Sequence, residues 1–95
     1  MPLRFEWDQE KARSNFRKHG ITFAEASTAF GDALSRTIPD PLHSEDEQRF
    51  ALIGQSLSGR LLVVVHTHRA ERTRSISARR ASNKERQQYE KNARR

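Results

Sequence analysis

The 95-residue sequence has no cysteine, few aromatic residues and no long hydrophobic run. Without cysteine, the chain cannot form disulfide bonds or a zinc site built on thiolates. No stretch approaches the roughly 20 apolar residues of a membrane-spanning helix, and the first residues lack the apolar core of a signal peptide. We therefore expect a cytoplasmic protein that makes no contact with a membrane.

Apolar residues are also scarce: 34% of the chain is hydrophobic, whereas 32% is charged. A chain of this length and composition forms one domain with a small core and modest stability. We expect this domain to span residues 1–91, with a frayed tail at residues 92–95.

Positive charge is concentrated in the second part of the chain. Residues 60–95 contain eleven Lys and Arg against three acidic residues, a net charge of +8, whereas residues 1–59 have a net charge of −2. Such asymmetry is typical of proteins that bind an anionic partner, either nucleic acid or an acidic protein. A basic protein without such a partner is the alternative.

Capping residues predict two short helices after an initial strand. Residues 3–7 alternate as in a strand, and Asp8 is a favourable N-cap for the helix that follows. Gly20 suits the left-handed residue after that helix, and Thr22 with Glu25 forms a capping box that begins the next one. Ala12, Phe16 and His19 share one face of the first helix, and Phe23, Ala26 and Phe30 give the second helix an apolar stripe.

The rest of the chain predicts four strands and a final helix. The strands are expected at 34–39, 50–55, 61–69 and 72–78, and the helix from a capping box at Ser82 through Tyr89. Residues 61–65 are apolar on both faces, which indicates a central strand. The fold class is α+β, in the order β-α-α-β-β-β-β-α: a small antiparallel sheet with an αα-hairpin packed on it and a C-terminal helix.

His66 and His68 are two residues apart and therefore share one face of their strand. Three interpretations remain open for the pair: structural or exposed histidines, metal ligands, or proton-transfer groups. Metal binding is the less favoured one, because zinc sites generally need three or four ligands and no third is evident. We expect neither a metal nor another cofactor.

The strand at 72–78 is expected to present a polar cationic surface. With regular alternation, Ile76 and Ala78 face the helices, whereas Ser75, Ser77 and Arg79 face outward. Hydroxyl and guanidinium groups suit a phosphate backbone. The alternative is a solvated edge strand whose charges prevent aggregation.

Three further residues have an ordinary structural explanation beside a functional one. Tyr89 can stack on a base or pack over the sheet edge. Lys18 and His19 close the first helix, where cations are favourable without any function.

Several segments together resemble the BrnT family. They keep the family's order over nearly the whole chain: residues 5–8, 15–20, 22–26, 63–69, 74–81 and 85–89. The resemblance implies a RelE-like fold and a ribonuclease toxin of a type II toxin–antitoxin pair, which cleaves RNA and arrests translation. It also implies a BrnA-like antitoxin that binds DNA, a toxin homodimer within the complex, and contact with DNA only through the antitoxin.

The resemblance carries over to individual positions. Arg79 or Arg80 matches the arginine after the last strand of RelE-like toxins, and Tyr89 matches the tyrosine of their final helix. Arg69 and Arg74 lie in strand motifs that match those of the family. Lys18 and His19 lie in its Lys-His-Gly motif. The chain departs from the family at Ser75, where an aliphatic residue is usual, and this weakens the assignment of faces in that strand.

RNA cleavage without metal uses the 2′-hydroxyl as nucleophile. It requires a base, cations for the phosphoryl oxygens and an acid for the leaving oxygen. Arginine stays protonated and binds phosphate well, so Arg69, Arg74 and Arg79, with Arg80 and Lys18, are expected to bind phosphate. Arg79 would also stabilise charge in catalysis, and His66, His19 and Tyr89 remain equal candidates for moving protons. The alternative function is a non-catalytic module that binds nucleic acid or a partner protein.

Overall fold

The computed structural model describes residues 4–40 and 48–93 and confirms the expected α+β fold. The elements in chain order are β1 (Arg4–Glu6), α1 (Gln9–His19), α2 (Phe23–Thr28), the 3-10 helix η1 (Ala29–Gly31), β2 (Arg36–Pro39), β3 (Arg49–Gln55), β4 (Leu61–Arg69), β5 (Arg72–Arg80) and α3 (Asn83–Ala93). The strands form one sheet in the order β1-β5-β4-β3-β2, antiparallel except for the parallel pair β1–β5.

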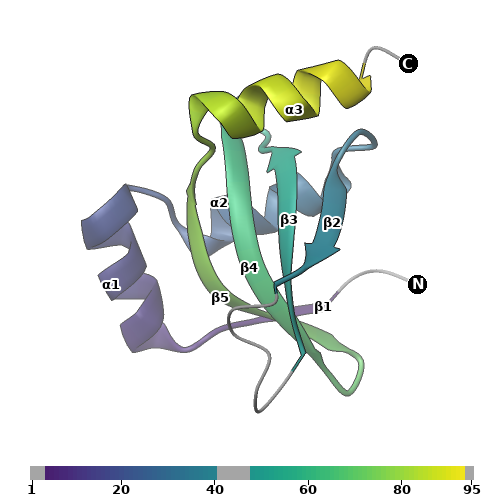
Figure 1. The fold of residues 1–95 in the computed structure, drawn as a ribbon. Coiled ribbons are helices and arrows are strands. Elements are labelled where there is room, and N and C mark those ends of the chain that lie inside the picture. Colours follow the sequence, from purple (N-terminus) through teal and green to yellow (C-terminus); the bar gives the residue numbers. More distant parts are fainter. Residues whose placement is uncertain (1–3, 41–47, 94–95) are drawn as a thin grey trace.

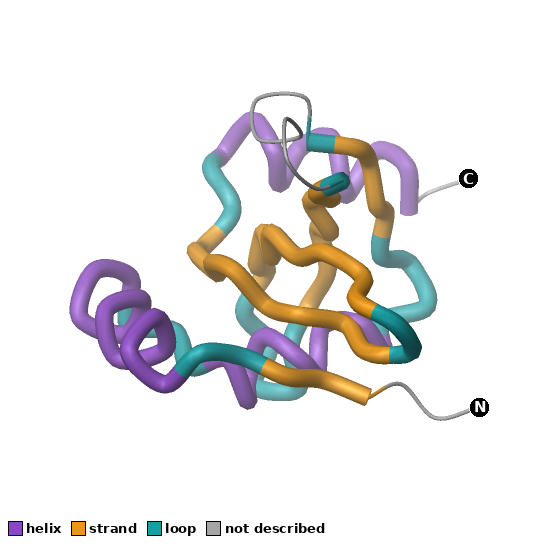
Figure 2. Tube along the Cα trace, turned by 90° about the horizontal axis from the view of Figure 1, so that it is seen from below, coloured by secondary structure: helices purple, strands orange, loops and turns teal. Residues whose placement is uncertain are grey.

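The sheet lies between two helical layers. Helices α1 and α2 pack on one face, and α3 crosses one end of the other face (Figure 1). The view along the sheet in Figure 2 shows the two layers on opposite sides of the strands. We call the two surfaces of the sheet the α1–α2 face and the α3 face. The described part of the chain contains no helix that is long and apolar enough to span a bilayer.

Local side-chain bonds set the ends of the helices as the sequence predicts. The Asp8 carboxylate accepts a hydrogen bond from the Glu10 N–H at 2.8 Å, and Gly20 adopts a left-handed conformation with φ 70°. The Thr22 hydroxyl accepts from the Glu25 N–H at the start of α2. The predicted αα-hairpin therefore forms from residues that are close in sequence. The sequence also predicts an acidic loop at residues 44–47, and these residues lie outside the described ranges.

The first helix buries a polar residue rather than the expected aromatic. Phe16 is 53% exposed, whereas Asn15 is buried. The Asn15 side chain donates to the carbonyl oxygens of Ile21 and Ala78, and its Oδ1 accepts from the Ala78 N–H at 2.9 Å. Phe16, on the face that the sequence assigns to Ala12 and His19, therefore stays outside the core, whereas Asn15 can be buried because three backbone groups satisfy its amide.

The core lies between β4, β5 and the first helical pair. It is formed by six buried residues: Ile21, Phe23, Ala26, Leu62, Val64 and Ala78. Leu61 and Val63, on the opposite side of β4, are also buried. This confirms that the middle of the sheet is covered on both faces.

A β-bulge changes the outward-facing residues of β5. Val65 pairs with Ser77 but His66 pairs with Ser75, so Ile76 is the extra residue. Ser75 therefore turns toward the α1–α2 face, where it is buried and its hydroxyl has no partner. The prediction that Ser75 lines an outer surface is wrong, whereas Ser77 and Arg79 do share the α3 face with Val65 and Val63.

We predict that Asn15→Ala lowers the free energy of unfolding by roughly 2–4 kcal/mol, because it leaves buried backbone groups of Ile21 and Ala78 without partners. Urea denaturation followed by circular dichroism measures the loss. Arg13→Ala, at an exposed position of the same helix, should change the value by less than about 0.5 kcal/mol. Equal values for the two variants would contradict the structural role of Asn15.

Candidate nucleic-acid interface

Seven arginines share the α3 face of the sheet. Cross-strand partners point to the same side, and the strand register therefore places on this face Arg4, Arg36, Arg49, Arg69, Arg72, Arg74 and Arg79. Arg49 and Arg74 are half-buried, and the other five are exposed. The sheet thus converts a sequence excess of positive charge into one cationic surface.

Glu6 of β1 lies among these arginines at one end of the face. Its carboxylate contacts the Arg74 guanidinium at 3.0 Å and that of Arg72 at 3.7 Å. One carboxylate cannot neutralise two guanidinium groups, so this end of the face keeps a positive charge. The pair also fixes the direction of the Arg74 side chain, which is about one quarter exposed.

A second ion pair lies at the opposite end, below α3. Both terminal nitrogens of Arg79 donate to Glu85, each at 2.8 Å. Hydrogen bonding to Arg79, with smaller help from Ser82, lowers the pKa of Glu85 to about 2. Glu85 also completes the predicted capping box, because it accepts from the Ser82 N–H at 2.8 Å and its own N–H donates to the Ser82 hydroxyl.

Tyr89 attaches α3 to the sheet through Asp32. The Tyr89 hydroxyl donates to Asp32 Oδ2 at 2.6 Å, and the same carboxylate accepts from the N–H groups of Gln55 and Leu34. Burial, and then the bond and charge of Asp32, raise the pKa of Tyr89 to about 12. Burial alone would raise the pKa of Asp32, but its three hydrogen bonds lower it. The tyrosine hydroxyl is therefore occupied by a structural bond.

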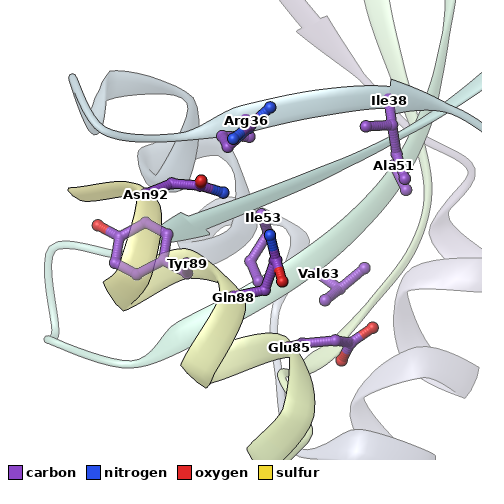
Figure 3. A pocket seen from close by; sticks show the side chains of 9 residues that line it. All are labelled: Arg36, Ile38, Ala51, Ile53, Val63, Glu85, Gln88, Tyr89 and Asn92. Atoms are coloured by element: carbon purple, nitrogen blue, oxygen red, sulfur yellow. The ribbon is translucent and has the colours of Figure 1, made fainter. Parts of the chain in front are cut away.

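A groove of about 280 Å³ separates α3 from the strands. Its lining residues come from α3 and from three strands: Arg36, Ile38, Ala51, Ile53, Val63, Glu85, Gln88, Tyr89 and Asn92. Figure 3 shows the polar side chains of α3 opposite the aliphatic residues of the sheet. The floor of the groove is thus apolar, with charged residues at its margins.

His66 belongs to the core rather than to this surface. It is 1% exposed, its Nδ1 lies 3.1 Å from the Val64 carbonyl oxygen, and its ring packs against Phe30 and Phe50. Burial lowers the pKa of His66 and favours its neutral form. His68 shares the face of His66, as expected, with ring centroids 5.5 Å apart. Both rings lie on the α1–α2 face.

The other predicted site residues also lie away from the α3 face. Arg80 pairs with Leu62 and therefore shares the α1–α2 face, where it is exposed. Lys18 and His19 are exposed in the last turn of α1. This helix belongs to the α1–α2 layer and lies at the left of the sheet in Figure 1. Of the eight predicted site residues, the α3 side brings together Arg69, Arg74, Arg79 and Tyr89.

These residues do not converge on a single point. Arg79 follows Arg74 by five positions along the strand, which places their Cα atoms roughly 16 Å apart. Arg69 pairs with Arg72, a further two residues away. A nucleic-acid strand along β5 would meet these cations in succession, so the arrangement suits several phosphates better than one.

Sequence reasoning did not single out Glu6, Arg36 or Asp32 for this surface. Glu6 meets an arginine 68 positions later, and Asp32 meets Tyr89 57 positions later. No local pattern reveals such pairs, but the alternation of Arg4 and Glu6 along β1 does indicate that they share a face. The described residues contain no cluster of three or more His, Asp or Glu side chains suited to a metal ion.

Comparison with known proteins shows the family to which the chain belongs. Residues 7–85 match the family model described as the ribonuclease toxin BrnT of type II toxin–antitoxin systems. The fold is similar to the crystal structure of the Brucella abortus ribonuclease toxin BrnT, with a TM-score of 0.67 and 24% identity over 86% of this chain and 100% of that one. No curated protein gives a significant match.

We predict that the single tyrosine ionises near pH 12 in the folded protein. Its raised pKa contributes stability that is present below pH 10 and is lost as the pH rises through 12. Absorbance of tyrosinate near 295 nm gives the midpoint. Asp32→Asn removes the charge and should move the midpoint toward 10. An unshifted midpoint near 10 in the folded wild type would contradict the Tyr89–Asp32 bond.

Proposed function

Because the chain belongs to the BrnT family of ribonuclease toxins from type II toxin–antitoxin systems, we propose that it cleaves RNA on the α3 face of its sheet. The arginines that share this face are the observation that supports placing RNA cleavage there. Arginine binds phosphate through a planar fork of donors and stays charged. The surface therefore matches the anionic substrate of the family's activity.

We assign contact with RNA to Arg69, Arg74 and Arg79. They follow the same face of β4 and β5, so successive phosphates of one strand can bind along it. Arg74 and Arg79 are held by Glu6 and Glu85, and a phosphate replaces a carboxylate as their partner. This exchange limits the loss of side-chain entropy on binding, because both guanidinium groups are already oriented.

Glu85 is our candidate for the base that accepts the proton of the 2′-hydroxyl. Its pKa is held near 2 mainly by Arg79. When Arg79 turns to a phosphate, this cause is removed and the carboxylate becomes a better proton acceptor. Arg79 then stabilises the charge on the phosphoryl oxygens. The 2′-oxygen attacks phosphorus without a metal to form a 2′,3′-cyclic phosphate, while the P–O5′ bond breaks and the leaving 5′-oxygen takes a proton from solvent water.

Tyr89 acts in this scheme as a positioning residue. Its bond to Asp32 fixes α3, and α3 carries Glu85. His66 and His19 receive no catalytic role, since one lies in the core and the other on the far helical layer. Arg80 and Lys18 likewise receive no role in binding RNA, because they lie away from the α3 face.

The biological consequence we propose is arrest of translation in the cytoplasm through RNA cleavage. The partner is a BrnA-like antitoxin that binds DNA and blocks the toxin, and the complex contains a toxin homodimer. The family description supports a partner of the antitoxin type. DNA then contacts the antitoxin and not this chain.

We predict that Arg79→Ala lowers RNA cleavage about 10²–10³-fold, because it removes charge stabilisation at the phosphate. Glu85→Gln should lower the rate about 10²-fold or more through loss of the base. Purified variants acting on a labelled single-stranded RNA give these rates. Growth and RNA integrity after induced expression provide the cellular readout.

The matched control is Arg13→Ala, which removes an exposed arginine from α1 and should leave the rate unchanged. Arg80→Ala, next to Arg79 but on the opposite face, should cost less than Arg79→Ala. Circular dichroism must show that each variant is folded. Wild type that binds RNA but leaves it intact would overturn the enzymatic proposal and favour the non-catalytic binding module.

Chelation provides a separate test of the metal-independent chemistry. Because arginines rather than a metal ion neutralise the phosphate in this proposal, 5 to 10 mM EDTA should leave the cleavage rate within about twofold of its value without chelator. Added Mg²⁺ should slow the reaction by screening the RNA. Abolished cleavage in EDTA, restored by a divalent metal, would refute this part of the proposal.

A further inference from the structure

The groove below α3 has a composition that RNA binding does not explain. Its floor consists of aliphatic side chains from three strands: Ile38 of β2, Ala51 and Ile53 of β3, and Val63 of β4. Ile38 remains 58% exposed. A phosphate backbone gains nothing from an aliphatic floor, and Tyr89, at 9% exposure, offers little ring surface for a base to stack on.

The margin of the groove is cationic on its outer side. Arg36 lines it from the edge strand β2, is exposed, and has no ion pair with any described residue. On the α3 side the lining residue Glu85 is paired with Arg79. An apolar strip with an exposed arginine along its β2 edge is complementary to a chain segment that carries aliphatic or aromatic side chains on one side and a carboxylate beside them.

We infer that this groove receives an acidic, amphipathic segment of the antitoxin, an assignment that rests on the proposed function. Its apolar side chains cover Ile38 and Ile53, and a carboxylate pairs with Arg36. Because Glu85 and Tyr89 line the same groove, a segment bound there also lies beside the proposed base. Binding then obstructs the substrate path without requiring contact with all of the arginines.

The location at the edge of the sheet favours an extended or helical segment over a folded domain. β2 has a strand neighbour on one side only, and all four of its residues are exposed. A segment can therefore enter from the β2 side and reach α3 without displacing any strand. Its apolar contacts supply affinity, and Arg36 supplies orientation.

The test measures affinity for a purified BrnA-like antitoxin from the same genome, by calorimetry or surface plasmon resonance. Ile38→Glu places a negative charge on the groove floor and should raise Kd at least about 100-fold, and Ile38→Ala should raise it about 10-fold by loss of apolar area. Arg36→Glu should raise Kd more than Arg36→Lys does. The matched control is Leu57→Glu, at an 88% exposed position outside the groove, for which Kd should stay within about twofold.

RNA cleavage measured without antitoxin distinguishes the proposed antitoxin site from the proposed ribonuclease function. Ile38→Glu and Leu57→Glu should both cleave RNA at the wild-type rate, while Ile38→Glu escapes neutralisation. An unchanged Kd for a folded Ile38→Glu overturns the inference, and lost cleavage with an unchanged Kd would instead assign the groove to RNA. If wild type does not cleave RNA but its binding still depends on Ile38, the proposed function fails and the partner site stands.

Discussion

The hydrogen-bonded pairing of β4 with β5 determines which side chains meet on each side of the molecule. Before the bulge, β5 directs Thr73 and Ser75 toward the α1–α2 layer; after it, Ala78 occupies that side and Arg79 the other. The single extra residue keeps Ser75 and Ala78 on the buried side of β5, while Arg74 and Arg79 both lie on the α3 face. Core formation and the placement of arginines are thus consequences of one register.

The two faces of the sheet differ in charge. The α1–α2 face carries the aromatic and aliphatic core, together with a neutral His66, whereas the α3 face carries seven arginines and only a few carboxylates among the described residues. Repulsion among the arginines opposes folding. Glu6 and Glu85 reduce that repulsion in the free protein, and a bound polyanion would reduce it further.

The sequence alone predicts features that depend on neighbouring residues. The caps at Asp8, Thr22 and Ser82 and the turn at Gly20 come from local chemistry, and the structure has all four. Local sequence could not predict the side of the sheet on which Ser75 lies, because the bulge depends on the partner strand. Contacts such as Tyr89 with Asp32 join residues 57 positions apart. The fold was therefore more predictable than the site, whose chemistry depends on tertiary pairing.

The buried amide of Asn15 has a consequence for fold specificity. Two of its three bonds are made to the backbone of Ala78 and form only when β5 presents that residue to α1. A slip of β5 by one position would exchange its two faces, turn Arg79 toward the core and leave the amide unsatisfied. Asn15 thus acts as a register check in addition to stabilising the native sheet: in a misaligned sheet its buried amide would lack partners, and this raises the energy of that alternative.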